Sequence, residues 1–289
     1  MTQAKKSYAE RGREFANKGR PCKTIMKKNL IYIPVFATLT SFLAAQTLPD
    51  IGIKQLPPQS TAIKGVLLPV PREIFDTLDK FENSNWRAVQ RPELARQRPH
   101  GDQAKTALLL GVVIAEGFIA VEAEDTDEVK SVGRAVLKLA RGLGVEKAAL
   151  RRSRSIVEHA EKGDWAGVRR EWDGVLPDVQ QGMNELKSEQ LAQLVSLGGW
   201  LRGAEALSTL VLQNYSNQKA ELLRQPALLD HFDKRLAGMR DDVQADPTIV
   251  RMRDGIQRIR PLVASEEISQ KRIREISAVS EQLLKCLAR

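Results

Sequence analysis

Two glutamates, Glu116 and Glu205, stand inside the two most apolar stretches of the chain. Two buried carboxylates that face each other share a proton or bind a metal, and helical di-metal proteins build such sites from glutamates and a Glu-x-x-His motif. None of the three histidines follows a glutamate by three positions. The sequence therefore predicts no metal site. It favours an internal ion pair between Glu205 and Arg202, which precedes it by three residues, and a partner from elsewhere for Glu116.

The densest group of basic residues in the body of the chain surrounds a predicted turn at Gly163. Two helices that meet at this turn would bring the basic side chains together, and a lipid headgroup or an acidic glycan is one partner for such a surface. The alternative is an ordinary solvated face, because Glu158, Glu161 and Glu171 lie close enough to offset the charge. The group consists of Arg151, Arg152, Arg154, Arg169 and Arg170.

Sequence motifs for catalysis and cofactors are missing. The chain contains no CxxC motif, no phosphate-binding loop and no serine or cysteine nucleophile in a strained turn. Its two cysteines, Cys22 and Cys286, are too few for a disulfide framework. We expect Cys286 to be buried, because leucines surround it. The sequence predicts no catalytic residue and no cofactor, and it favours a non-enzymatic function.

The stretches that carry the two glutamates predict helices over about 103–122 and 189–215. Each is apolar nearly all round, which is typical of a helix in the middle of a bundle. Both contain the pair Leu-Gly, at 110–111 and 197–198, and this similarity suggests an internal duplication of a helical unit. Small residues along both stretches would allow the helices to approach closely: Gly111, Ala115, Gly198, Gly199 and Gly203.

Apolar residues recur at intervals of three and four through the rest of the body, which predicts further amphipathic helices. Asp125, Asp164 and Ser265 are the predicted N-caps, Pro226 opens a helix, and Pro177 predicts a break. We therefore expect residues 72–289 to form one all-α domain, either a multi-helix bundle or an irregular helical array. The apolar stripes cover about 129–143, 165–186, 229–243, 249–263 and 276–287.

The first 45 residues have the pattern of a leader. Lys27 and Lys28 precede an apolar run from Leu30 to Leu43, and small residues follow it, as in a signal peptide or an uncleaved anchor. Translation is expected to begin at Met26. Five prolines in residues 46–71 predict an extended tether.

The net charge of +9 is concentrated in this leader, because residues 46–289 carry only +2. Nucleic acid is therefore not an expected partner. We expect an exported protein of the periplasm, the cell envelope or the exterior, which acts by contact with another protein or by self-association. A membrane contact is expected only through an uncleaved N-terminal segment. The alternative is a small-molecule or lipid-binding bundle, with a pocket between the two apolar helices and Glu116 or Glu205 as its polar group.

Overall fold

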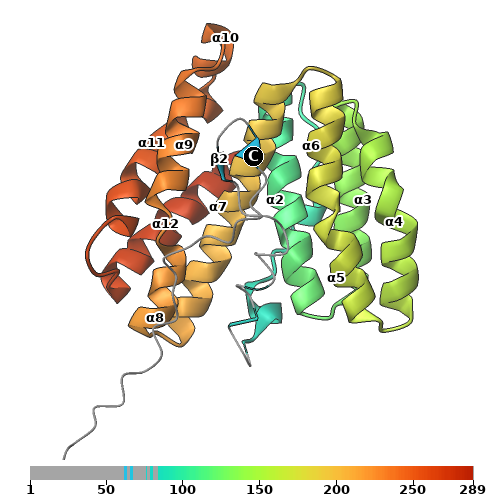
Figure 1. The fold of residues 1–289 in the computed structure, drawn as a ribbon, viewed down its shortest axis with the longest axis horizontal. Coiled ribbons are helices and arrows are strands. Elements are labelled where there is room, and N and C mark those ends of the chain that lie inside the picture. The colour runs from blue at the N-terminus through green and yellow to red at the C-terminus, as the bar shows by residue number, and fades with distance from the viewer. Residues whose placement is uncertain (1–61, 64–65, 68–75, 77–78, 81–83, 289) are drawn as a thin grey trace, which may run out of the picture. The chain divides into compact units, whose positions relative to one another are not determined.

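The computed structural model describes residues 62–63, 66–67, 76, 79–80 and 84–288. The leader and most of the 46–71 tether lie outside the described residues. A short antiparallel ladder joins β1 (Ala62–Ile63) to β2 (Val66–Leu67). From residue 84 onward the described chain is helical, which confirms the all-α prediction for the body (Figure 1).

The first half of the body is a bundle of four rods, where a rod is one helix or two consecutive helices that run on in line. The fourth rod is interrupted and consists of α5 and α6. An all-apolar helix, α2, packs against the amphipathic α3, then α4 packs on α3, and α5 and α6 return beside α4. The break between α5 and α6 falls at Gly174, three residues before Pro177, which lies in the first turn of α6 and so has no helical hydrogen bond to lose. The elements are η1 (Trp86–Val89), η2 (Leu94–Arg96), α2 (Gln103–Glu122), α3 (Thr126–Gly142), α4 (Glu146–Glu161), α5 (Trp165–Asp173) and α6 (Val175–Glu185).

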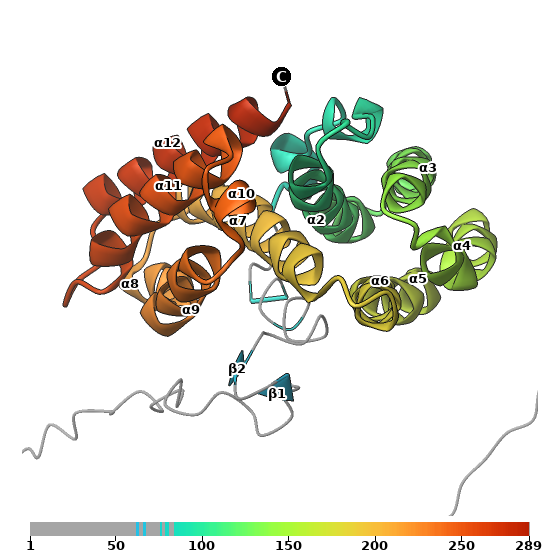
Figure 2. The ribbon, with the colours of Figure 1, turned by 90° about the horizontal axis from the view of Figure 1, so that it is seen from above.

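The second half repeats this plan with a second all-apolar helix, α7, as its first rod. The helix α12 packs on α7, α11 packs on α12, and α9 packs on α11 (Figure 2). Both halves therefore place four rods in the same cyclic order, and the duplication of a helical unit stays a prediction. The elements are α7 (Glu189–Gln213), α8 (Asn217–Ala220), η3 (Glu221–Leu223), α9 (Pro226–Ala237), α10 (Asp241–Gln244), α11 (Pro247–Val263) and α12 (Gln270–Leu287).

The two halves are joined by the contact between α2 and α7, which run in the same direction (Figure 1). Glycines let the two backbones touch, because a Cβ atom added to Gly198 would lie 2.0 Å from the carbonyl oxygen of Leu108. A Cβ atom on Gly111 would lie 1.9 Å from the carbonyl oxygen of Val195. The Leu-Gly pairs noted in the sequence thus meet each other at the crossing. By contrast, Gly203 has open space around it and plays no part in this packing.

The helix α2 is the one described helix that is long and apolar enough to cross a membrane. Its most apolar window is 89% buried inside the protein, as expected for the core helix that its pattern predicts.

Three of the four helix starts predicted from caps or proline are correct. Asp125 and Asp164 cap α3 and α5 through side-chain oxygens that accept from backbone N–H groups, and Pro226 opens α9. The predicted cap at Ser265 is wrong, because α12 begins at Gln270. Ser265 instead lies just beyond α11, where its hydroxyl is within hydrogen-bond distance of the carbonyl oxygens of Leu262, in the last turn of α11, and of Glu267.

Candidate functional site

The most unusual feature of the described chain is a buried cluster of charges beside the crossing of α2 and α7. Arg202 of α7 is fully buried, and so is Glu116 of α2. The Arg202 Nε atom donates to Glu116 Oε2 at 2.7 Å, and Arg202 Nη1 donates to Glu205 Oε2 at 2.5 Å. The pairing predicted between Arg202 and Glu205 is therefore present, and the same arginine also supplies the partner that Glu116 requires.

Two further partners come from the segment ahead of α2. The backbone N–H of Arg91 donates to Glu116 Oε1 at 2.6 Å, and Arg91 Nη2 donates to Glu205 Oε1 at 2.8 Å. Arg202 Nη2 donates to the carbonyl oxygen of Val89. Each oxygen of the two glutamates thus accepts from a donor of the protein. The cluster thus pairs two arginines with two carboxylates, and protein donors occupy every carboxylate oxygen.

This cluster fastens residues 84–97, here called the strap, across the crossing. Trp86, Val89 and Leu94 bury their side chains against the helices, and η1 contacts both α2 and α7. At the start of the strap, Arg87 Nη1 lies 3.4 Å from the Asp125 carboxylate. Glu116 and Glu205, the candidate site residues of the sequence, therefore bind a segment of the same chain through Arg91.

The histidines of α4 and α9 lie near single polar partners. His159 Nδ1 lies 2.7 Å from Asp164 Oδ2, in the turn where Asp164 also caps α5. His231 Nε2 lies 3.3 Å from Gln193 Oε1, and burial, followed by the charges of Arg235 and Lys234, lowers the pKa of His231. Within the described residues, no group of three His, Cys, Asp or Glu side chains is placed to hold a metal ion.

The predicted basic patch is largely paired with acidic residues. Arg152 binds both Asp178 and Glu171, and it packs over Gly174, where an added Cβ atom would lie 2.0 Å from its guanidinium carbon. Arg154 Nε lies 2.7 Å from Glu158. Arg151 shares Asp178 with Arg152, Arg169 binds Asp79 and Glu122, and Arg170 is exposed. The arrangement is closer to the solvated, charge-balanced alternative than to a concentrated anion site.

Cys286 is half-buried rather than buried. It is followed by the buried Leu287 and preceded by the buried Leu283 and Leu284, but its own position on α12 turns partly toward solvent.

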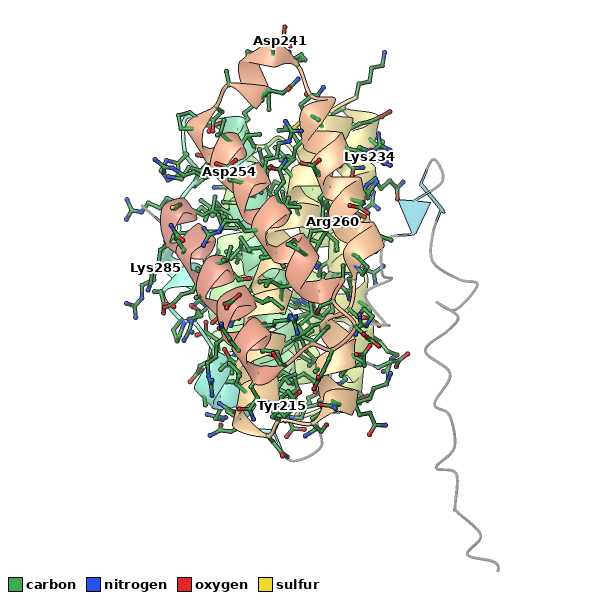
Figure 3. All side chains as sticks on the ribbon, turned by 90° about the vertical axis from the view of Figure 1, so that its left-hand side faces the viewer. Tyr215, Lys234, Asp241, Asp254, Arg260 and Lys285 are labelled. Carbon is green, nitrogen blue, oxygen red and sulfur yellow. The ribbon has the colours of Figure 1, made fainter. Side chains whose placement is uncertain are left out.

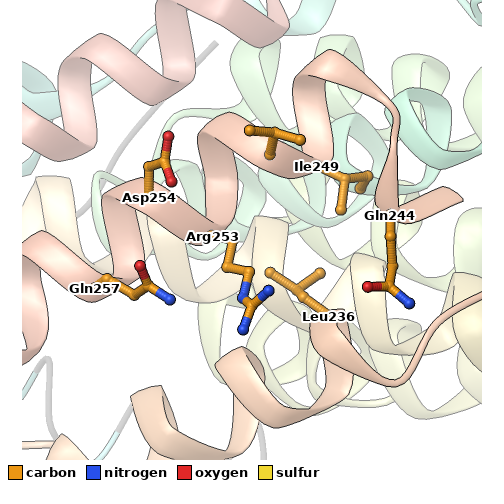
Figure 4. Close-up of a pocket in the computed structure, with 7 residues that line it drawn as sticks. Leu236, Gln244, Ile249, Arg253, Asp254 and Gln257 are labelled. Carbon is orange, nitrogen blue, oxygen red and sulfur yellow. The ribbon is translucent and has the colours of Figure 1, made fainter. Parts of the chain in front are cut away.

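Two depressions on the described surface lie on the second bundle, away from the crossing. One of about 150 Å³ opens between α9 and α11, where Leu236 and Ile249 line it together with Gln244, Arg253 and Gln257 (Figure 4). Another of about 370 Å³ lies between α11 and α12, beside Arg258, Leu262 and Glu275. The side of the molecule that carries α11 and α12 is densely covered by charged side chains, including Asp254, Arg260 and Lys285 (Figure 3).

The face of α7 that points away from α2 is more exposed than the face that packs against α2. Trp200, Gly203 and Leu207 follow one another along this face and are all partly exposed, whereas Gly198, Arg202 and Glu205 on the opposite face are buried. Trp200 donates from Nε1 to Gln225 Oε1 at 3.0 Å, and its ring centroid lies 6.0 Å from that of Phe232. The apolar pattern of α7 predicts a helix in the middle of a bundle, and α7 does pack between α2 and α12, but this face is only partly buried.

Comparison with known proteins gives no relative: no family model matches the chain, and no curated protein or solved structure matches it.

Proposed function

We propose that this protein is an exported, non-enzymatic helical protein of the cell envelope or exterior, and that it binds a helix of a partner protein along the free face of α7. The observation that carries the proposal is the row Trp200, Gly203 and Leu207, which lies partly exposed on a helix whose opposite face is sealed. Export rests on the leader pattern of residues 26–45.

The comparison of the two halves supports a helical partner. In the first half, α3 packs closely along α2, whereas in the second half the corresponding rod, α9, touches α7 only sparingly. Among the described residues, part of the face that α3 covers on α2 thus has no equivalent cover on α7. Gly203 lies in this uncovered part with no atom within 4 Å of an added Cβ, so another helix can approach closely there.

The alternative of a ligand pocket between the two apolar helices has less support. Backbone contacts at Gly111 and Gly198 close the crossing, and the carboxylates of Glu116 and Glu205 are fully engaged by Arg202 and the strap. The polar group that would orient a ligand is therefore already occupied.

Site-specific photo-crosslinking in the native cells tests the interaction. A photoreactive amino acid at Gly203 should give a discrete adduct with one protein, and the same amino acid at Gly133 of α3 should not. Gly133 is the matched control, because it is also a helical glycine with open space around it. Trp200→Ala should weaken the adduct at 203 at least several-fold if the row is the contact surface.

No adduct at 203, or equal adducts at 203 and 133, would contradict the proposed surface. Export is tested separately, with a reporter fused after residue 70 and a matched fusion protein that lacks Leu30–Ala45. Retention of both fusion proteins inside the cell would exclude export and leave the α7 surface open to its own test.

A further inference from the structure

The arginines of α11 divide between two sides of the helix, and one side faces α9. There Arg253 Nε lies 2.9 Å from Asp233 Oδ1. One helical repeat of seven residues later, Arg260 Nε lies 2.5 Å from Asp230 Oδ1. Each of these two arginines has a carboxylate of α9 as its partner, so the charge on this side of α11 is balanced within the protein.

A second pair, Arg251 and Arg258, lies on the side toward α12. Positions 251, 255, 258 and 262 follow one another at intervals of four, three and four, so they share one face of α11. A Cβ atom added to Gly255 would lie 2.4 Å from Leu283 Cδ1 of α12, so this face borders α12. Arg251 and Arg258 therefore stand along the edge of the groove between the two helices.

This second pair has no carboxylate partner among the described residues. Both side chains are exposed, and Arg258 Nη1 reaches only the neutral Gln282 Oε1, at 3.5 Å across the groove. Asp254 and Glu275 lie on the same surface, which keeps an excess of two positive charges. Its exposed cations without an ion pair to a described carboxylate are Arg251, Arg258, Lys271 and Arg274.

The groove between α11 and α12 contains the depression of about 370 Å³, whose lining is largely apolar. Leu262, Ala278 and Val279 supply the apolar lining, beside Arg258 and Glu275. The two helices face the viewer in Figure 3, and no described element covers them. Residues 247–288 hold eight basic and five acidic side chains, whereas residues 46–289 carry only +2 in all. The basic excess of the body is therefore concentrated on these helices and the turn between them.

We propose that the groove between α11 and α12 is a second interaction surface, which binds an acidic amphipathic helix of a partner protein. Arg251 and Arg258 are seven residues apart, or about 10 Å along the helix axis. Two carboxylates seven positions apart on a docked helix match this distance, and each can pair with one planar guanidinium. Apolar side chains on the same face of the docked helix then pack on Leu262 and Val279.

The shape and the charge of the groove favour a helix over a lipid surface or a nucleic acid. Two neighbouring helices with an apolar lining between them form the kind of groove that accepts a third helix. Phosphate binding needs a more concentrated basic surface than an excess of two charges. The groove lies on the second bundle, apart from the row Trp200, Gly203 and Leu207 of α7, so this proposal does not rest on the one made for that row.

A fluorescence anisotropy titration of the full chain tests the proposal. The probe is a labelled helical peptide with two glutamates seven positions apart and leucines between them on the same face. Its matched control carries glutamine in place of both glutamates and should bind about fivefold more weakly, because the arginines lose their partners. No measurable binding of the glutamate peptide, or equal binding of the two peptides, would overturn the proposal.

Variants of the chain locate the binding site. The double variant Arg251→Gln, Arg258→Gln should bind the glutamate peptide about fivefold more weakly, because it removes the cations at the groove edge. The double variant Arg253→Gln, Arg260→Gln makes the same change of charge on the side toward α9 and should alter binding by less than about twofold. Circular dichroism checks that both variants are folded. Equal losses in the two variants would contradict the assigned groove.

Two further ligands and one further variant complete the test. Phosphatidylserine vesicles and duplex DNA should each bind more weakly than the glutamate peptide at physiological salt. Tighter binding of either ligand that depends on Arg251 and Arg258 would replace the acidic helix by a membrane or a nucleic acid. Trp200→Ala should leave the affinity for the peptide unchanged, so that failure at the α7 row and failure at this groove are seen separately.

Discussion

The guanidinium of Arg202 and the carboxylate of Glu116 form an ion pair at 2.7 Å in which both side chains are fully buried. The two residues come from different halves of the fold, so this bond crosses the plane where α2 and α7 meet. Its geometry is completed by Glu205 and by the backbone of the strap. Each partner satisfies a charge that would otherwise lie in an apolar core.

Removal of one partner should therefore be costly. We expect Arg202→Met to lower the free energy of unfolding by about 3–5 kcal/mol, because it leaves two buried carboxylates with too few donors. Urea denaturation followed by circular dichroism measures the change. The exposed pair of Arg154 and Glu158 is the control, and Arg154→Ala should change stability by less than about 0.5 kcal/mol. Equal effects of the two substitutions would argue against the structural role of the cluster.

Two glycines on α7 should respond in opposite directions to the same substitution. Gly198→Ala should destabilise the protein by about 1–3 kcal/mol, because the new methyl group collides with the backbone of Leu108. Gly203→Ala should be neutral or stabilise by up to about 1 kcal/mol, since its site is open and alanine has the higher helix propensity. Thermal denaturation of both variants gives the signs. An undiminished stability of Gly198→Ala would show that the crossing is looser than the backbone contacts indicate.

Helix caps give a third comparison. Asp246 accepts from the backbone N–H groups of Thr248 and Ile249 at the start of α11, so Asp246→Ala should cost about 1 kcal/mol. Ser188 and Ser269 occupy the N-cap positions of α7 and α12 without a side-chain hydrogen bond of this kind. Their substitution by alanine should therefore cost clearly less. Chemical denaturation of the three variants checks the order.

Glu122 predicts a pH dependence of stability. Burial, opposed by the charge of Arg169, raises its folded-state pKa to about 7, above the ordinary value of 4.5, so the folded chain binds more protons than the unfolded chain between these values. The contribution of Glu122 to the free energy of unfolding is therefore most favourable below pH 4.5. It declines as the pH rises from 4.5 to about 7 and stays constant at higher pH. The pKa difference corresponds to about 3 kcal/mol, and screening near the partly exposed Arg169 reduces the expected loss to about 2 kcal/mol.

Glu122→Gln should remove this decline, so the difference in stability between wild type and variant should change by about 2 kcal/mol from pH 5 to pH 8. Guanidinium denaturation at several pH values measures it. A wild type that gains stability relative to the variant as pH rises would contradict the raised pKa.

Most of the helical layout follows from local sequence signals. The periodic stripes and the caps at Asp125 and Asp164 placed α3 and α5, because period and capping depend on residues close together in the chain. Ser265 is a residue type that often caps helices, and two glutamates follow it, but its hydroxyl bonds instead to the carbonyl groups of Leu262, in the last turn of α11, and of Glu267. That choice depends on how α11 ends, which no short pattern near Ser265 encodes.

The candidate site was predictable only in part. Glu116, Arg202 and Glu205 stood out because charges are rare inside apolar helices. Val89 and Arg91 gave no such signal, since a backbone carbonyl group and an arginine in an irregular segment look ordinary in sequence. Likewise, the exposed side of Trp200 depends on how sparingly α9 covers α7, a tertiary relationship that no local pattern around Trp200 encodes.

The crossing at Gly111 and Gly198 has a consequence for the order of events on the ribosome. When α2 emerges, the helix that covers its glycine face is still unmade, because α7 begins at Glu189. A nascent chain that stops before this point can already cover α2 with α3, but the glycine face of α2 that α7 covers stays exposed, and such apolar surfaces are prone to aggregate unless a chaperone shields them. We therefore expect that division of the body at the 186–188 turn leaves the apolar crossing faces of α2 and α7 exposed and yields poorly soluble halves.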